Sequence, residues 1–400
     1  MRFSHSGRQG LRLVRAQAKP WWLLVAIVLA VAGSSSPGMS AGTKTVKIPY
    51  MGAITGPFAA VGLPMANSVQ LAVELAKKNA AQKGIALLYM PADDQMDAAQ
   101  APQVARNVIQ DTDVLATVGP MFGIDLNSAG PIFTQAGVAM LTPGASAAVL
   151  STHGWTMFRM IPNDDTQGAV GANYIIKVLK LSKVAVIDDS TQYGHGVALV
   201  VGDKLKASGV SVTDMESVAS TPGDYSATIS KILTSGAAGV FMGGSITTQY
   251  TLMRQLRDKG FKGAYVAPDG ALNPDFPDKS GPGSEGAIIT CQCAPVPAYG
   301  GPASGPLAEY VAAYKAAYKQ EPQAYSPEAF DAADLIISGL LAGKLDRASM
   351  LAYIRGVKFK GVANTYSFQS SGELNGTNMN IYKVQNGKIQ WLGTSDSLIK

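Results

Sequence analysis

From about residue 44 onward, two hydrophobic patterns alternate along the chain. Short apolar runs, typical of buried strands, are separated by longer segments in which apolar residues recur every three or four positions, as on one face of a helix. The pattern predicts strands at residues 45–50, 85–90, 114–118, 138–141, 183–187, 210–218, 239–242, 264–267 and 287–293. It predicts helices at residues 64–81, 98–110, 125–135, 166–179, 196–207, 225–235, 248–259, 306–319, 328–341 and 348–355.

This order of elements predicts an α/β fold. Strands that alternate with helices form βαβ units, whose helices cover both faces of a mostly parallel sheet. So many strands favour two sheets over one, and therefore two lobes. Residues 275–286 and 295–306 are rich in proline and glycine and are interpreted as loops. Near the end, Asn386-Gly387 lies between two β-type runs and predicts a hairpin over residues 378–392.

The first forty residues differ from the rest. A basic start without any acidic residue is followed by the apolar run 21–32 and then by small and polar residues, which is typical of a secretory signal peptide. Cleavage is expected after Ala32 or near Ser40, and a retained membrane anchor is the alternative, although a span takes about 20 apolar residues. No cysteine lies near either position, so we expect a freely soluble periplasmic protein.

Charge gives no indication of a nucleic-acid partner. The N-terminal segment holds five of the 33 basic residues and none of the 28 acidic ones, so the remaining chain is formally neutral. Its positive and negative residues are interleaved and form no basic stripe. We therefore predict that the protein does not bind nucleic acid.

Motifs for catalysis or cofactor binding are scarce. Residues 281–286 match G-x-G-x-x-G, but they precede a predicted strand, whereas the dinucleotide-binding turn follows one. The sequence has three histidines and neither a phosphate-binding P-loop nor an H-E-x-x-H motif. The acid pairs Asp93-Asp94 and Asp188-Asp189 are interpreted as caps and solvated loop acids. We predict a protein that is not an enzyme and has no cofactor or metal.

Cys291 and Cys293 are the two cysteines of the chain. If both lie in the predicted strand 287–293, their Cα atoms are roughly 6.5–7 Å apart, at the limit for a disulfide. We interpret them as two structural or weakly paired thiols.

Residues 138–146 are the most informative segment. An apolar strand ends at Thr142-Pro143-Gly144, and a run of small residues that includes Ser146 follows. Free backbone N–H groups and a hydroxyl at such a point can bind an anion. Taken alone, the segment is more simply explained as a plain strand-to-helix turn with Ser146 as the cap.

Polar and aromatic residues also follow other predicted strands. They lie at residues 119–123, 146, 192–194, 243–245 and 268–270. In open α/β sheets ligands bind outside the carboxyl ends of the strands. These loops therefore predict a cleft that binds a small molecule.

These segments resemble the periplasmic leucine/isoleucine/valine-binding proteins, the type I solute-binding proteins of ABC transporters. The resemblance rests on the order and spacing of short pieces, which are residues 52–57, 141–146, 192–194, 243–244 and 267–270. It implies two Rossmann-like lobes, joined by three hinge crossovers, that close on a ligand. It also implies these boundaries: 1–40 for the signal peptide and spacer, 44–163 with 293–376 for one lobe, and 164–292 with 377–400 for the other.

The resemblance implies roles for individual residues. Ser146 contacts the carboxylate and amino groups of an amino acid, together with main-chain groups of Gly144 and Ala145. Asp269 pairs with the ammonium group. Tyr193 frames the ligand from the second lobe, and Tyr325 lies beside the ligand side chain.

Three positions depart from the family pattern. Gly123 replaces a carboxylate-binding serine and keeps an N–H group but no hydroxyl, Ser245 replaces a tyrosine, and Val61 replaces an aromatic residue. The pocket is then expected to be wider and to be lined by Met121, Phe122 and Val61.

We therefore predict a monomeric periplasmic binding protein that delivers a branched-chain or other apolar amino acid to an ABC permease in the inner membrane. A binding protein or sensor for an amide, a urea or an aromatic acid is the alternative. A secreted α/β enzyme is the remote alternative.

Overall fold

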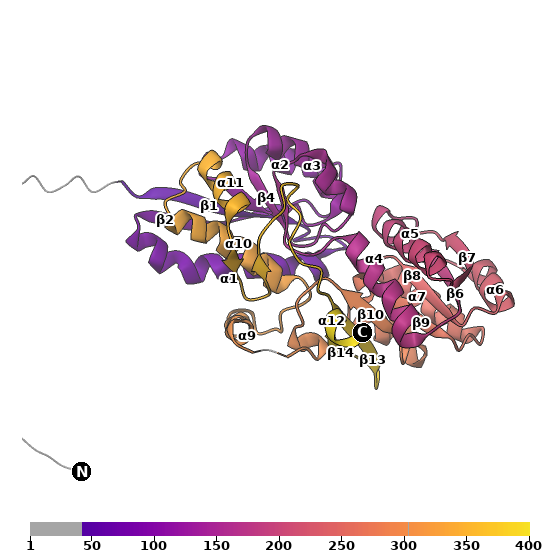
Figure 1. Ribbon diagram of the computed structural model, residues 1–400. Coiled ribbons are helices and arrows are strands. Elements are labelled where there is room, and N and C mark those ends of the chain that lie inside the picture. Colours follow the sequence, from indigo (N-terminus) through magenta and orange to yellow (C-terminus); the bar gives the residue numbers. More distant parts are fainter. Residues whose placement is uncertain (1–41, 303) are drawn as a thin grey trace, which may run out of the picture. The chain divides into compact units, whose positions relative to one another are not determined.

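The computed structural model describes residues 42–302 and 304–400. The predicted signal peptide and its cleavage sites lie outside the described residues. Two sheets organise the chain from residue 42 onward, and helices surround both of them (Figure 1). The mixed α/β fold with parallel-rich sheets confirms the predicted fold class.

The first sheet has the strand order β2-β1-β3-β4-β5 and is parallel throughout. Its strands are β1 (Lys44–Gly52), β2 (Ile85–Asp93), β3 (Ala116–Val118), β4 (Ala139–Thr142) and β5 (Met157–Arg159). Its helices are α1 (Ala59–Gln82), α2 (Ala101–Gln110), α3 (Gly123–Gln135), α10 (Ser326–Leu341) and α11 (Arg347–Gly356). Figure 1 shows α1 and α10 on one face of this sheet and α2 and α3 on the other. We call this part the first lobe.

The second sheet has the order β14-β13-β10-β9-β8-β6-β7. Its strands are β6 (Lys183–Asp188), β7 (Ser211–Ser217), β8 (Gly239–Gly243), β9 (Ala264–Ala267), β10 (Ile288–Cys291), β13 (Asn380–Gln385) and β14 (Lys388–Thr394). β13 runs antiparallel to β10 and β14, and the other pairs are parallel. We call this part the second lobe.

The second lobe also contains helices. They are α4 (Asp164–Asn173), continued by a π-helical segment (Tyr174–Leu179), α5 (Gln192–Ala207), α6 (Ser226–Ser235), α7 (Ile246–Asp258), α8 (Asp275–Ser280) and α12 (Ser395–Leu398). The helix α9 (Pro306–Tyr318) packs against α1, and the two-residue strands β11 (Phe359–Lys360) and β12 (Thr365–Tyr366) pair with each other. Short 3-10 turns cover Ala148–His153, Asp269–Ala271, Gly281–Ser284 and Pro297–Tyr299.

The chain passes between the two sheets three times. It does so after β5, after β10, and before β13, so that β13 and β14 complete the second sheet. The carboxyl ends of β4 and β9 lead into the loops that carry Ser146 and Asp269. Apolar side chains hold each sheet, as on β1, where Val46, Ile48 and Tyr50 lie in the cluster beside α1 and Met51 lies in the cluster beside α2 and α3.

Most predicted elements are present with shifted ends. The helix α1 begins at Ala59, five residues before the predicted start, because Pro64 is tolerated inside it. Residues 275–286 were predicted as a loop, which is wrong for α8, where Pro277 lies in the first turn. The three-residue strand β5 was not predicted, since so short a run has no measurable period.

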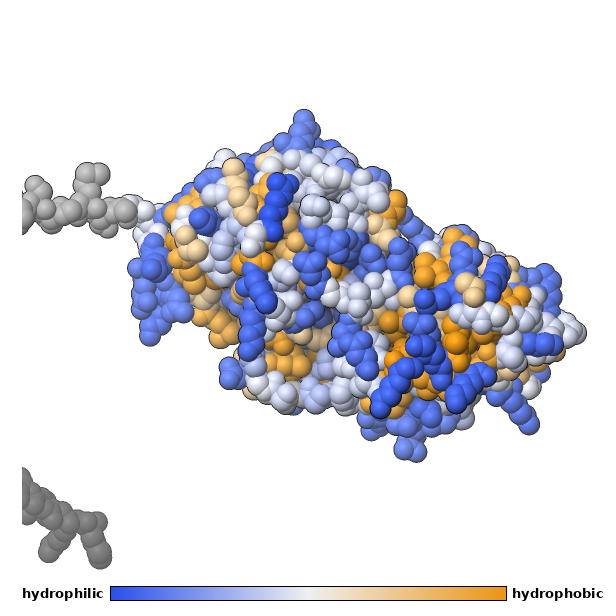
Figure 2. Space-filling model, in the orientation of Figure 1, coloured by the Kyte–Doolittle hydropathy of each residue, from blue (hydrophilic) through white to orange (hydrophobic). Residues whose placement is uncertain are grey.

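Apolar length alone does not separate core helices from membrane spans. The helix α1 is long and apolar enough to cross a bilayer, but 56% of its most apolar window is buried against the rest of the first lobe. Its contacts with β2 and α10 are those of a core helix. On the face in Figure 2, hydrophilic and hydrophobic residues are interspersed over both lobes.

Candidate functional site

Two loops of the first lobe lie side by side where β3 and β4 end. The Thr142 hydroxyl donates to the Pro120 carbonyl at 2.8 Å and accepts from the Ala145 N–H at 3.0 Å. A Cβ atom on Gly144 would lie 2.9 Å from the Met121 carbonyl oxygen, so only glycine fits without movement. The structure thus brings Met121, Gly144 and Ala145 together, and their role toward a ligand stays a prediction.

A buried arginine braces the loop that carries Ser146. Arg159, at the end of β5, has no exposed surface and donates to the carbonyl groups of Ala145 and Ala147, the latter at 3.0 Å. Its Nε and Nη2 atoms lie 3.2 and 3.1 Å from the two carboxylate oxygens of Glu373. The carbonyl groups of the two residues next to Ser146, Ala145 and Ala147, are therefore turned toward the arginine. This fixes the orientation of the backbone at Ser146, which is 8% exposed.

Asp269 is the centre of a second group of polar side chains. It follows β9, and its Oδ1 atom accepts from the Tyr193 hydroxyl at 2.7 Å and from Gln167 Nε2 at 2.6 Å. Its Oδ2 atom accepts from the Tyr325 hydroxyl at 2.5 Å. Burial and the nearby Asp269 charge raise the pKa of both tyrosines well above the usual value, so both phenols stay protonated and act as donors.

A second carboxyl group, that of Asp164, connects the two lobes. Asp164 begins α4, is 3% exposed, and its main-chain N–H donates to the Ser146 carbonyl at 2.9 Å. Burial raises its pKa to about 7, the Asp269 charge adds to the rise, and a hydrogen bond from the Ser146 side chain opposes it. Gln292 Nε2 lies 3.4 Å from Asp164 Oδ1. Ser146 and Asp269 therefore both neighbour Asp164, although they follow strands of different sheets.

Gly123 and Phe122 lie at the start of α3. Gly123 is the first residue of the helix, where main-chain N–H groups have no partner within the helix. The Phe122 ring packs edge-on against Phe58, with 6.0 Å between the ring centroids. Asn127 Nδ2, one turn further along, donates to Gln192 Oε1 of the second lobe at 3.1 Å. Gly123 thus faces the second lobe, since a Cβ atom on it would lie 3.9 Å from Gln192 Oε1.

Ser245 and Val61 have other surroundings. The Ser245 N–H donates to Asp189 Oδ2 at 2.7 Å, and its hydroxyl lies 3.4 Å from that of Thr248, one turn along α7. These contacts are those of a residue that precedes a helix. Val61 lies in the first turn of α1 and is partly buried. The described contacts join neither residue to Asp269, Tyr193 or Ser146.

The acid pairs at strand ends accept hydrogen bonds from loop N–H groups, and three of the four acids are buried, whereas Asp93 is partly exposed. Asp189 is fully buried and accepts from the Thr191 N–H and the Ser245 N–H. Asp188 and Asp94 are also buried, at 5% and 0% exposure. The expectation of solvated acids is wrong for these three because the loops that follow β2 and β6 fold back over their side chains.

Cys291 and Cys293 form a disulfide, so the expectation of two thiols is wrong. The expected spacing assumed that both lie in one extended strand. β10 ends at Cys291, and the chain bends at Gln292, which brings the two Cα atoms to 5.2 Å. That distance lies within the range for a disulfide.

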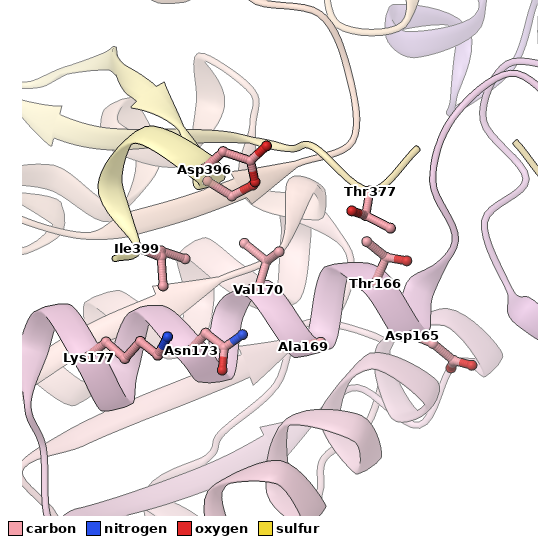
Figure 3. A pocket seen from close by; sticks show the side chains of 10 residues that line it. Asp165, Thr166, Ala169, Val170, Asn173, Lys177, Thr377, Asp396 and Ile399 are labelled. Carbon is pink, nitrogen blue, oxygen red and sulfur yellow. The ribbon is translucent and has the colours of Figure 1, made fainter. Parts of the chain in front are cut away.

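Side chains that could hold a metal are not grouped anywhere in residues 42–302 or 304–400. A pocket of about 460 Å³ lies elsewhere, between α4 and the end of the chain (Figure 3). Thr166, Val170 and Ile399 contribute to its wall, and the predicted site residues do not.

Four residues of this region were not predicted, namely Arg159, Asp164, Gln167 and Gln292. Arg159, Asp164 and Gln292 lie in a strand, at a helix start and at a bend, where a polar residue alone gives no functional signal. Gln167 is fully buried on the first turn of α4, and a buried glutamine needs polar partners. Its partners are Asp269 and the Thr290 carbonyl.

Comparisons with known proteins show the family of the chain. Residues 45–388 match a family described as periplasmic binding protein. The chain is 29% identical over 358 residues to a leucine-, isoleucine-, valine-, threonine- and alanine-binding protein of Pseudomonas aeruginosa, covering 89% of this chain and 93% of that protein. It is 26% identical over 341 residues to the Leu/Ile/Val-binding protein of Escherichia coli, covering 85% and 90%.

Solved structures share the fold. The branched-chain amino acid transporter substrate-binding protein LivJ of Streptococcus pneumoniae, in complex with isoleucine, has a TM-score of 0.77 and 22% identity, covering 87% of this chain and 99% of that one. A solute-binding protein of an ABC transporter from R. palustris, in complex with 4-hydroxybenzoate, has a TM-score of 0.75 and 19% identity, covering 88% and 96%.

Proposed function

The chain belongs to the periplasmic binding protein family, and from that membership we propose that it captures a branched-chain or other apolar amino acid for an ABC permease. The proposal places the protein in the periplasm as a monomer, with the permease in the inner membrane. It assigns the protein a binding role without catalysis. The named relatives that bind leucine, isoleucine and valine support the ligand class.

One observation carries this proposal, the grouping of donors around Asp269. Tyr193, Tyr325 and Gln167 hold a carboxylate at the end of β9, so that a ligand ammonium can bind an oriented, negatively charged group. A hydrogen bond to a charged group contributes about 1.5–3 kcal/mol. The partner of an ammonium is therefore fixed before the ligand arrives.

The ligand carboxylate is proposed to bind the loops of the first lobe. The Ser146 hydroxyl and main-chain N–H groups at the start of α3 are suited to an anion. Gly123 contributes an N–H there. The two charged groups of an amino acid would then meet one lobe each, with the apolar side chain beside Tyr325 and Phe122.

The proposal also includes the boundaries of the two lobes. Residues 44–163 with 293–376 would move as one body and residues 164–292 with 377–400 as the other, closing around the ligand by hinge motion. The crossovers after β5 and β10 lead directly through Asp164 and Gln292. Ligand binding would therefore act on residues of the hinge itself.

An amide, a urea or an aromatic acid is the second candidate. The R. palustris protein in complex with 4-hydroxybenzoate shares the fold, and the Phe58–Phe122 pair offers an aromatic surface. Asp269 and Asp164 oppose an anion that has no ammonium group. A neutral amide is the form of this alternative that the two carboxyl groups tolerate best.

A ligand screen by thermal shift and calorimetry tests the proposal. We expect leucine, isoleucine or valine to stabilise the protein, by about 2.7 kcal/mol at a hundred-fold excess over Kd. Lysine and glutamate are the matched controls, with the same backbone groups and a charged side chain. A response to 4-hydroxybenzoate, acetamide or urea, without any response to amino acids, would contradict the proposal and favour the second candidate.

A further inference from the structure

The chain leaves the second sheet through a small covalent ring. Cys291 ends β10, Cys293 follows two residues later, and their disulfide encloses the backbone of Gln292. Both cysteines are buried, at 0% and 1% exposure. The ring restricts the backbone dihedrals of Gln292, and with them the direction in which its side chain leaves the chain.

The Gln292 side chain lies between the Tyr325 hydroxyl and the Asp164 carboxyl group. Its Oε1 atom lies 3.0 Å from the Tyr325 hydroxyl, and its Nε2 atom lies 3.4 Å from Asp164 Oδ1. The Tyr325 hydroxyl also donates to Asp269. A phenol has a single proton, so the Tyr325 hydroxyl donates either to Asp269 Oδ2 or to Gln292 Oε1, and these two acceptors together set the position of the phenol.

The residues on both sides of the ring are held as well. The Cys291 sulfur lies 3.7 Å from the Tyr325 hydroxyl, and the Cys293 carbonyl accepts from Asn380 Nδ2 at 2.8 Å. The Ala294 N–H donates to Glu328 Oε1 at 2.5 Å, and Glu328 lies in the first turn of α10, just after Tyr325. The crossover and the segment that carries Tyr325 are therefore tied to each other at two points.

The size of the ring argues against a role in global stability. A disulfide stabilises the fold mainly by restricting the unfolded chain, and that effect grows with the length of the closed loop. A loop that encloses one residue is the smallest case, so its contribution to the free energy of unfolding is expected to be small. What a ring of this size does restrict is the local backbone at Gln292.

We propose that the Cys291–Cys293 disulfide and Gln292 together form a positioning element of the ligand site. The ring fixes the Gln292 backbone, Gln292 holds the Tyr325 phenol and the Asp164 carboxyl, and Tyr325 in turn orients Asp269. This inference rests on the proposed function, because its effect is measured as affinity for an amino acid. Neither cysteine nor Gln292 needs to touch the ligand.

Calorimetry with leucine tests the proposal on four forms of the protein: wild type, Gln292→Ala, the double variant Cys291→Ala/Cys293→Ala, and the triple variant. We expect Gln292→Ala and the double variant each to weaken binding about three- to ten-fold, the loss of one oriented hydrogen bond. In the triple variant we expect the same weakening as in Gln292→Ala alone, because the ring acts through Gln292. Gln103→Ala, on the exposed side of α2, is the matched control and should bind as the wild type does.

Each contrary result has a separate meaning. Unchanged affinity in Gln292→Ala overturns the proposal, whether or not the double cysteine variant folds. Losses that add in full in the triple variant also overturn it, because the disulfide then acts independently of Gln292. If the alanine double variant does not fold, Cys291→Ser/Cys293→Ser replaces it, and failure of both to fold contradicts the small stabilising role. A wild-type protein that binds no amino acid overturns the proposed function and this inference together. If the wild-type protein binds leucine, the variants test this inference separately from the proposed function.

Discussion

The first lobe presents main-chain groups and the Ser146 hydroxyl to the proposed site, whereas the second lobe presents the Asp269 carboxylate with the Tyr193 phenol. The main chain of the first lobe is oriented by buried residues such as Arg159, which donates to the carbonyl groups of Ala145 and Ala147. In the second lobe, the two side chains contact each other directly.

This difference predicts where substitutions act. The main-chain groups of the first lobe depend on the buried side chains that orient them, such as Arg159. Substitution of these buried side chains should therefore lower the stability of the fold. In the second lobe, the side chains of Asp269 and Tyr193 are themselves proposed to contact the ligand. Substitution of these side chains should therefore lower the affinity for the ligand and leave the fold intact. The following predictions separate the two cases.

Arg159→Ala is expected to have the largest effect. Its removal leaves Glu373 and the carbonyl groups of Ala145 and Ala147 without their buried donor. Breaking a buried ion pair on one side costs about 3–5 kcal/mol, to be measured as the free energy of unfolding in urea. Arg106→Ala, an exposed arginine on α2, is the control. Stability equal to that of the wild type would show that the loop does not need its brace.

Asp164→Asn should change how stability depends on pH. The pKa of Asp164 is raised to about 7 from the ordinary 3.8 by burial, so between these values the folded chain holds a proton that the unfolded chain has released. Stability therefore falls as pH rises from about 4 to about 7, by at most about 1.4 kcal/mol per pH unit for one proton. The variant should flatten this slope only in part, because Asp125, Glu328, Asp331 and Asp94 also have raised pKa values.

Unfolding in urea at several pH values, without ligand, measures that slope. Asp165→Asn is the matched control, since Asp165 is the exposed neighbour of Asp164 on α4. An unaltered slope in Asp164→Asn would mean that Asp164 is ionised in the folded protein throughout this range.

Asp269→Ala is expected to weaken an amino-acid ligand by about ten- to a hundred-fold, which corresponds to the loss of one charge-assisted hydrogen bond. Calorimetry measures the affinity, and thermal unfolding shows whether the fold is intact. Asp275→Ala, at the exposed start of α8, removes the same charge nearby and should have no effect. Undiminished binding in Asp269→Ala would exclude Asp269 as the ammonium partner.

Ser146→Ala is expected to have the smallest effect, a loss of about two- to ten-fold in affinity, because a neutral hydroxyl is removed while the braced backbone remains. The same calorimetric titration measures it, with Ser211→Ala at the exposed start of β7 as the control. A loss as large as that of Asp269→Ala would contradict the view that the first lobe binds through its backbone.

The sequence predicted the long helices and strands and their division between two sheets, because each long element carries a clear apolar period. It placed Tyr193, Asp269 and Tyr325 at element ends, and the structure brings these three residues into contact. Their roles toward a ligand stay predictions. Ser245 was predicted from its place after a strand and Val61 from the resemblance, and the described contacts link neither residue to Asp269.

The residues that connect the site could not be predicted from local sequence. Arg159 meets Glu373 across 214 positions, and Gln167 meets Asp269 across 102. No periodic pattern encodes such pairings, since they depend on how the sheets are assembled. The disulfide was missed for a local reason, because a bend at Gln292 cannot be told from a continuing strand by hydrophobicity.

The contact between Arg159 and Glu373 has a consequence for the order in which the protein matures. The main chain of Arg159 also donates to the Gly372 carbonyl, so the end of β5 is completed by residues near the end of the chain. During synthesis from the N-terminus, the Ser146 loop is made early but receives its brace only after almost the whole chain has emerged. A nascent or truncated chain that stops before Gly372 should therefore possess most of the first lobe but lack a finished ligand loop.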